Sequence, residues 1–268
     1  MVLISNVTSK HIEFAINAAK NNMDLFIEKP LSHSMKQINE LKNIVSKKKL
    51  ITMIGCNFRF HEAIKKMKKL IDENQIGKPI FAKAENGTYL PSWHPYEDYR
   101  KSYAARIDLG GGVVLTCIHE LDYLYWMFGK IREVIASTGK ISDLDIKAED
   151  YAGIIIKFKN NLIAEIHLDY FQIPVKRSCV VIGTKGKVMC DLETNVVQLY
   201  KNSSNKWYQK LKLKNYDINE TYKKELKHFL YCVKIRKETI NPLSHGIEIL
   251  KIALSIKESS KQKKTIKL

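Results

Sequence analysis

The stretch that decides the fold is MVLISNVTSKHIEFAINAAKNNMDLFIEKP, residues 1–30. Val2–Ser5 is a continuous apolar run typical of a buried strand, and the residues from Ile12 to about Asn22 present an apolar helical face. Leu25–Ile27 is a second short strand. A second apolar helix from Ser34 and a third strand at Leu50–Ile54 follow. Strands and helices that alternate with short connections predict a parallel sheet with right-handed crossovers.

The rest of the chain has a different pattern. A helix is expected from about Ala63 to Asp72, and an alternating strand at Ile80–Tyr89. Further strands are expected at Val134–Gly139, Tyr151–Phe158, Leu162–Tyr170 and Ser178–Gly183, with two closing helices at Asn219–Val233 and Gly246–Ser259. We therefore predict an α/β unit over residues 1–58. A mostly antiparallel α+β domain, with its helices on one face of a large sheet, would occupy residues 59–268.

Composition excludes several classes of protein. The longest apolar runs, such as Tyr151–Ile156, are too short to span a bilayer, so we expect no membrane segment, and the start of the chain does not resemble a signal peptide. The five cysteines are odd in number and none form a C-x-x-C pair, which argues against disulfides and zinc and favours a reducing cytoplasm. No metal is expected.

The net charge of +17 comes mainly from lysine, because only six of the 45 basic residues are arginine. Base-reading surfaces depend on arginine for its bidentate fork. We interpret the lysines as solvated helix faces and expect no nucleic-acid partner. Nucleic acid or an anionic ligand is the alternative interpretation.

Glu28-Lys29-Pro30 ends the second predicted strand. Ligands bind at this carboxyl end of strands in open α/β sheets. A lysine there can polarise a substrate oxygen and stabilise a developing alkoxide. A plain surface turn is the alternative.

A second motif is the glycine run Gly110–Gly112, which is expected to open a helix carrying His119 and Asp122 on one face. Imidazole titrates near neutral pH, so His119 could take the proton of a hydroxyl, and Asp122 could orient it or hold a substrate hydroxyl. The alternatives are a hydrogen-bonded core histidine and, more remotely, a metal ligand without a visible third partner.

The long polar segment between Leu90 and Ile107 clusters aromatic residues with His94, Arg100 and Arg106. Structureless loops of this length are usually functional. Trp93 and the two arginines would suit the faces and hydroxyls of a sugar. The alternative is a structured interface loop.

Four motifs occur together in one order. They are Asn6, Thr8 and His11 after the first strand, the EKP turn, the segment GCNFRF at Gly55–Phe60, and the glycine-led helix with His119 and Asp122. Over nearly the whole chain this set resembles the Gfo/Idh/MocA oxidoreductases. The resemblance implies that residues 1–58 are a partial Rossmann unit, the C-terminal part of a doubly wound sheet. The segment HPYEDYRKSYAARIDLGGG (94–112) looks most like members from surface-polysaccharide or nonulosonic-acid biosynthesis.

The resemblance also implies roles for individual residues. Lys29 and His119 would be catalytic, Asp122 would contact the substrate, and the cofactor would be lined by Asn6, His11, Glu28, Pro30 and Arg59. The reaction would move hydride between a carbon of a sugar or sugar nucleotide and NAD or NADP. A homo-oligomer built on the large sheet is expected.

The chain departs from the family pattern at two places. Thr116 stands where many members carry an aspartate before the histidine, and a hydroxyl cannot supply the charge that raises histidine basicity. There is no G-x-G-x-x-G, and Met1 falls at what looks like the fourth strand of the sheet. We therefore expect weakened cofactor binding, low activity, an open strand edge and exposed apolar helix faces. A non-catalytic oligomeric scaffold, or a fragment of a split or mis-started gene, is the alternative function.

Overall fold

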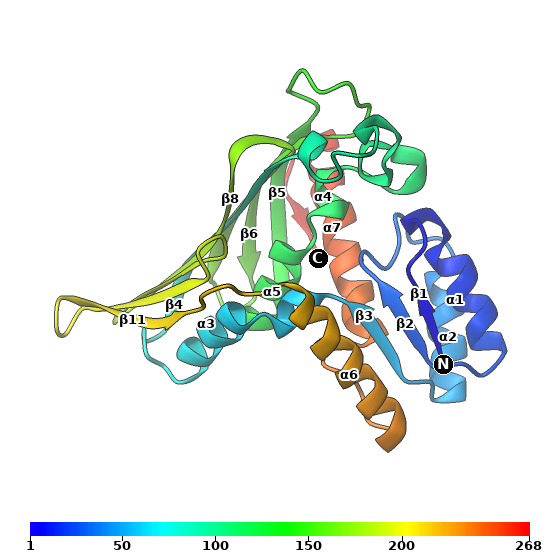
Figure 1. The fold of residues 1–268 in the computed structure, drawn as a ribbon, viewed down its shortest axis with the longest axis horizontal. Coiled ribbons are helices and arrows are strands. Elements are labelled where there is room, and N and C mark those ends of the chain that lie inside the picture. Colours follow the sequence, from blue (N-terminus) through cyan, green and yellow to red (C-terminus); the bar gives the residue numbers. More distant parts are fainter.

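The computed structural model describes all 268 residues and contains two separate sheets (Figure 1). The first is a three-stranded parallel sheet in the order β1 (Val2–Ile4), β2 (Leu25–Glu28) and β3 (Thr52–Gly55). Helices α1 (His11–Lys20) and α2 (Ile38–Lys48) form the crossovers. The predicted strand–helix alternation is thus confirmed.

β2 and β3 are buried on both faces, which explains why they are continuous apolar runs. Leu25 and Ile27 belong to the main core together with α1. Phe26 points to the opposite face, where its ring meets Phe229 of α6 (Asn219–Ile235) edge-on at 5.6 Å. A helix from the end of the chain therefore covers a sheet from its beginning, as Figure 1 shows.

The two edges of this sheet differ. β1 pairs only with β2, and Leu3 and Phe14 beside it are 50% and 54% exposed. The β3 edge is covered by residues 239–243. There the Ile54 amide donates to the Asn241 carbonyl at 2.8 Å, and the Leu243 amide donates to the Thr52 hydroxyl at 3.0 Å. The C-terminal region thus completes the first sheet.

The second sheet has nine strands in the order β11-β10-β9-β8-β4-β7-β6-β5-β12, and only the β4–β7 pair is parallel. This confirms the large, mostly antiparallel sheet. The strands are β4 (Pro79–Tyr89), β5 (Ile131–Gly139), β6 (Tyr151–Phe158), β7 (Ile163–Asp169), β8 (Phe171–Gly183), β9 (Gly186–Asp191), β10 (Val196–Lys201), β11 (Lys206–Lys212) and β12 (Ile266–Lys267).

Helices cover one face of this sheet, as expected. They are α3 (Glu62–Asp72), α4 (Val113–Thr116), α5 (His119–Phe128) and α7 (Leu243–Gln262). The boundary near residue 58 falls in a 3-10 turn, η2 (Asn57–Phe60), which links β3 to α3. None of the helices combines the length and apolar character that a bilayer crossing requires.

Candidate active site

Lys29 lies at the carboxyl end of β2, followed by a cis peptide bond to Pro30. Its Nζ donates to the carbonyl oxygen of Thr116 at 3.0 Å, across 87 residues of sequence. Burial opposes the charge of the ammonium, but the nearby Tyr103 phenol and Glu28 carboxylate outweigh it and raise the pKa of Lys29. Lys29 therefore stays charged and available as a hydrogen-bond donor.

The glycine-led helix is broken, whereas the sequence predicted one continuous helix. α4 ends at Thr116 and α5 starts at His119, with Cys117 and Ile118 between them. A helix end leaves carbonyl oxygens without intrahelical partners. Lys29 donates to one of these carbonyl oxygens, so the break in the helix connects the EKP turn with the glycine-led helix.

His119 begins α5 and is 8% exposed. Its Nδ1 is buried and has no hydrogen-bond partner. Burial, and then the positive charges of Lys29 and Arg177, lower the pKa of His119 well below its ordinary value. The imidazole is thus neutral near pH 7 and able to accept a proton. Lys29, held at Thr116, is thus near enough to His119 for its charge to act on the imidazole.

Asp122 makes no hydrogen bond to His119 and pairs with Arg59 instead. Oδ2 accepts from Arg59 Nε and Oδ1 from Arg59 Nη2, each at 2.8 Å, and the two side chains are 0% and 1% exposed. Arg59 Nη1 donates to the Ile240 carbonyl. In this structure Asp122 and Arg59 thus form a closed buried ion pair, and the predicted substrate contact of Asp122 and cofactor contact of Arg59 stay predictions.

Asn6, His11 and Pro30 form one unit at the ends of β1 and β2. The ring of His11 is buried, and its Nδ1 and Nε2 lie 2.9 Å from the carbonyl oxygens of Pro30 and Asn6. Burial lowers the pKa of His11. His11 thus fixes the turn that carries Lys29, while Asn6 remains exposed at the end of its strand.

The loop between β4 and α4 is built from short 3-10 turns, η3 to η6, spanning residues 90–109. Trp93 donates from Nε1 to the Thr88 hydroxyl and packs edge-on against Tyr170. Arg100 pairs with Asp98 and Asp145, and Arg106 pairs with Asp108, all at the exposed surface. The structure does not bring these two arginines to Lys29 and His119. The residue of this loop that comes near Lys29 is Tyr103.

Arg177 of β8 is a site residue that the sequence did not reveal. Its Nε and Nη2 donate to the two oxygens of buried Glu120, at 2.8 and 3.1 Å. Its guanidinium lies 3.8 Å from the ring centre of Phe58, and that ring lies 4.8 Å from the His119 ring. The only available signal was a charged Glu120 in a mostly apolar helix, because its partner Arg177 is 57 residues away.

Glu225 Oε1 is also buried without a hydrogen-bond partner, while the buried Tyr170 hydroxyl interacts with the side chain of Thr116. Buried polar atoms without partners are uncommon in native proteins and call for an explanation. Together with Lys29 and the unpartnered His119, they fit the nicotinamide end of a dinucleotide and a hydroxylated substrate. The residues of this chain offer no glycine-rich strand–helix turn for the pyrophosphate.

Comparison with known families agrees with this geometry. Residues 1–56 match the model of an oxidoreductase family with an NAD-binding Rossmann fold, and residues 64–189 match the GFO/IDH/MocA C-terminal domain. The chain belongs to the Gfo/Idh/MocA family of oxidoreductases. The predicted partial Rossmann unit and nicotinamide cofactor are thus confirmed at the level of the family, and the matched model names NAD.

Relatives of this Gfo/Idh/MocA chain act on cyclic polyols and sugars. The myo-inositol 2-dehydrogenase of Thermotoga maritima is 28% identical, over all of this chain and 79% of the relative. The scyllo-inositol 2-dehydrogenase (NAD(+)) of Bacillus subtilis is 25% identical, over 89% of this chain and 69% of the relative. The 2,7-anhydro-N-acetylneuraminate hydratase of Mediterraneibacter gnavus, 26% identical over 71% of this chain and 51% of the relative, echoes in part the nonulosonic-acid resemblance.

Solved structures share the fold. Levoglucosan dehydrogenase in complex with NADH and levoglucosan superposes with a TM-score of 0.90 at 17% identity, covering all of this chain and 80% of that one. Aldose-aldose oxidoreductase from Caulobacter crescentus gives 0.86 at 20% identity, over all of this chain and 78% of that one. At this identity the likeness establishes the architecture only.

Proposed function

We propose that this Gfo/Idh/MocA protein is an NAD(H)-dependent dehydrogenase that oxidises a ring hydroxyl of a polyol or sugar, or reduces the matching ketone. The main support for the proposal is that a charged Lys29 and a neutral His119 lie near each other at the carboxyl end of a parallel sheet. The two inositol dehydrogenase relatives support the substrate class.

Bound NAD⁺ would supply the hydride acceptor. Lys29 would donate a hydrogen bond from Nζ to the reacting hydroxyl oxygen and stabilise the charge that develops on it as the C–H bond breaks. His119 would take the hydroxyl proton, so the alcohol loses a hydride and a proton and becomes a ketone. In the reverse direction His119 would return the proton.

The cofactor would lie along the ends of the strands, where Asn6, Glu28 and Pro30 are placed. Trp93 and Tyr103 would border the substrate. We assign Arg59, His11 and Asp122 to holding the site in shape, because their hydrogen-bonding groups are already used within the protein.

The test is binding and turnover with the purified chain. NADH and NADPH are titrated by fluorescence, and NADH formation is followed with a panel of inositols, aldoses and acidic sugars. Lys29→Met and His119→Asn are each expected to lower kcat by about 10²- to 10⁴-fold. Lys36→Met, an exposed lysine, is the matched control and should leave kcat unchanged. Turnover that survives both site substitutions would refute the assignment.

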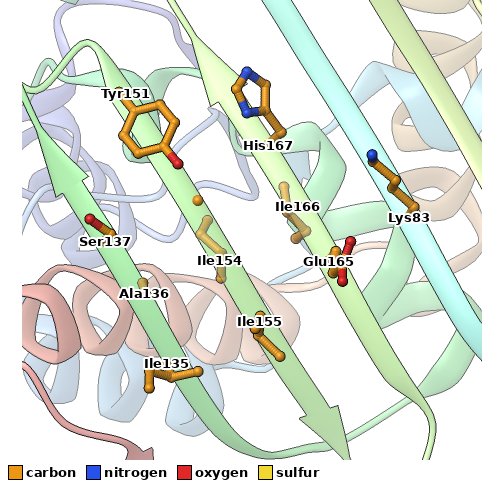
Figure 2. A pocket seen from close by; sticks show the side chains of 11 residues that line it. Lys83, Ile135, Ala136, Ser137, Tyr151, Ile154, Ile155, Glu165, Ile166 and His167 are labelled. Atoms are coloured by element: carbon orange, nitrogen blue, oxygen red, sulfur yellow. The ribbon is translucent and has the colours of Figure 1, made fainter. Parts of the chain in front are cut away.

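We also propose a homo-oligomer formed through the uncovered face of the large sheet. Ile135 of β5 lies directly opposite Ile155 of β6, and both are nearly half exposed. Figure 2 shows them beside Lys83, Glu165 and His167 on neighbouring strands. An apolar sheet face rimmed by polar groups favours association. Light scattering should show an oligomer that Ile155→Lys dissociates, while an unchanged mass for the variant would contradict it.

The five cysteines are all free thiols buried in the core. This favours a reducing compartment, which we propose to be the cytoplasm.

A further inference from the structure

His119, the proposed proton acceptor, has no hydrogen bond at its buried Nδ1. A histidine that acts as a base is usually held in one orientation by a third group bonded to this nitrogen. Rotation of an imidazole about its outer side-chain bond has a broad range when nothing restrains it. In the absence of that hydrogen bond, the orientation of the His119 ring depends on the side chains that pack against it.

Phe58 of η2 is the aromatic residue that packs against this imidazole. The two ring centres are 4.8 Å apart, and the ring planes are inclined by 33°. This separation lies within the range of attractive aromatic packing. Phe58 is 7% exposed, so its ring is enclosed by the protein and presents a fixed apolar surface to His119.

Two further side chains hold the Phe58 ring. The guanidinium carbon of Arg177 lies 3.8 Å from the ring centre, within the range of a cation–π contact. The ring of His61 stacks on Phe58 with centres 5.5 Å apart and planes inclined by 17°. His61 is itself fixed at the start of α3, because its Nδ1 accepts from the Ala63 amide at 3.2 Å. The Phe58 ring is therefore held by contacts from both β8 and the start of α3.

The Arg177 guanidinium is fixed in turn by Glu120. Its Nε and Nη2 donate to the two carboxylate oxygens at 2.8 and 3.1 Å, and the Glu120 side chain is 0% exposed. A two-pronged pair of this kind sets the plane of a guanidinium as well as its position. Glu120 directly follows His119 in α5. The contacts therefore form a closed circuit that returns to the proposed base through one peptide bond: His119, Phe58, Arg177 and Glu120.

We propose that Phe58 is a positioning residue, which holds the imidazole of His119 in one orientation, and that the Arg177–Glu120 pair holds Phe58. Phe58 acts through His119 and takes no proton itself. An aromatic surface restrains the imidazole while leaving both ring nitrogens free of a protein hydrogen bond to Phe58, so orientation is set without occupying the atoms that exchange the proton. This inference rests on the proposed dehydrogenase function.

The experiment compares Phe58→Leu with wild type, and Phe58→Met is the milder variant if Phe58→Leu fails to fold. Phe158→Leu is the matched control, because Phe158 is also buried and packs edge-on against Phe128 at 5.7 Å, but lies in β6 of the large sheet. All three changes should lower the melting temperature, since each removes buried apolar volume. Only the Phe58 variants should lower kcat, by about 10- to 100-fold with KM little changed, because a misoriented base slows the reaction without weakening substrate binding.

A second measurement reports on the imidazole itself and needs no turnover. The protein is prepared with isotope-labelled histidine, the His119 signals are assigned by their loss in His119→Asn, and the order parameter of the ring is measured by NMR relaxation. The His119 ring should become less ordered in the Phe58 variants and stay as ordered as wild type in Phe158→Leu.

Full kcat in the Phe58 variants, or a His119 ring as ordered in them as in wild type, would overturn the positioning role. A fall in kcat of similar size in Phe158→Leu would also overturn it, because the effect would then follow from lost stability alone. A wild-type chain without turnover, whose His119 ring still loses order in the Phe58 variants, would instead overturn the proposed function and support the packing role of Phe58.

Discussion

Replacing Asp122 by asparagine should destabilise the protein strongly, because it leaves the Arg59 guanidinium buried without a counter-charge. The pair is closed on all sides: the two side chains are 0% and 1% exposed, joined by two hydrogen bonds of 2.8 Å, with Arg59 also bound to the Ile240 carbonyl. Removing one partner of a buried pair typically costs about 3–5 kcal/mol. With a shift of about 2–4 °C per kcal/mol for a chain approaching this size, the melting temperature should fall by about 6–20 °C.

The assay is thermal unfolding followed by circular dichroism, with urea unfolding as a second measure. Asp108→Asn is the matched control, because Asp108 also pairs with an arginine, Arg106, but the two side chains are 63% and 48% exposed. An exposed pair contributes only about 0–1 kcal/mol. The double variant Arg59→Met/Asp122→Leu should recover much of the lost stability, since it removes the charge as well as its partner.

The competing interpretation is that Asp122 binds the substrate, as the sequence pattern implied. In that case the Asp122→Asn variant should have an almost unchanged melting temperature and a KM for the sugar at least tenfold higher. A tenfold rise corresponds to a loss of about 1.4 kcal/mol of binding free energy. A melting shift below about 2 °C together with such a KM would refute the structural assignment.

Three further predictions follow from the site and its loop. Arg177→Met removes a charge that lowers the pKa of His119, so the acid limb of kcat/KM against pH should move towards neutral, and an unmoved limb would contradict that influence. Gly112→Ala should lower the free energy of unfolding, measured with urea, by about 1 kcal/mol or more. The reason is that φ is +101° and that a Cβ would lie 2.4 Å from the Glu149 carboxyl group. A variant as stable as wild type would mean that the loop can relax. Arg100→Met and Arg106→Met should leave KM and kcat within about twofold of wild type, because both side chains pair with aspartates at the surface; a large rise in KM for either would return it to the substrate site.

The sequence was sufficient to predict the structural features that depend on the pattern of neighbouring residues. Apolar periodicity located the three parallel strands of the first sheet and their helices. Short motifs at predictable places, such as the EKP turn and the glycine run before His119, identified both proposed catalytic residues, because each motif lies within a few residues of its own structural context.

The sequence by itself therefore determined the fold class, the family, and the two groups proposed to handle the proton. Only the tertiary structure decided how these groups are held. It broke the helix at Thr116 to give Lys29 a carbonyl partner, and it closed Asp122 onto Arg59 and Glu120 onto Arg177. These partners are 57 to 87 residues apart. Buried charges select partners by three-dimensional geometry and desolvation, and a sequence pattern read locally contains neither.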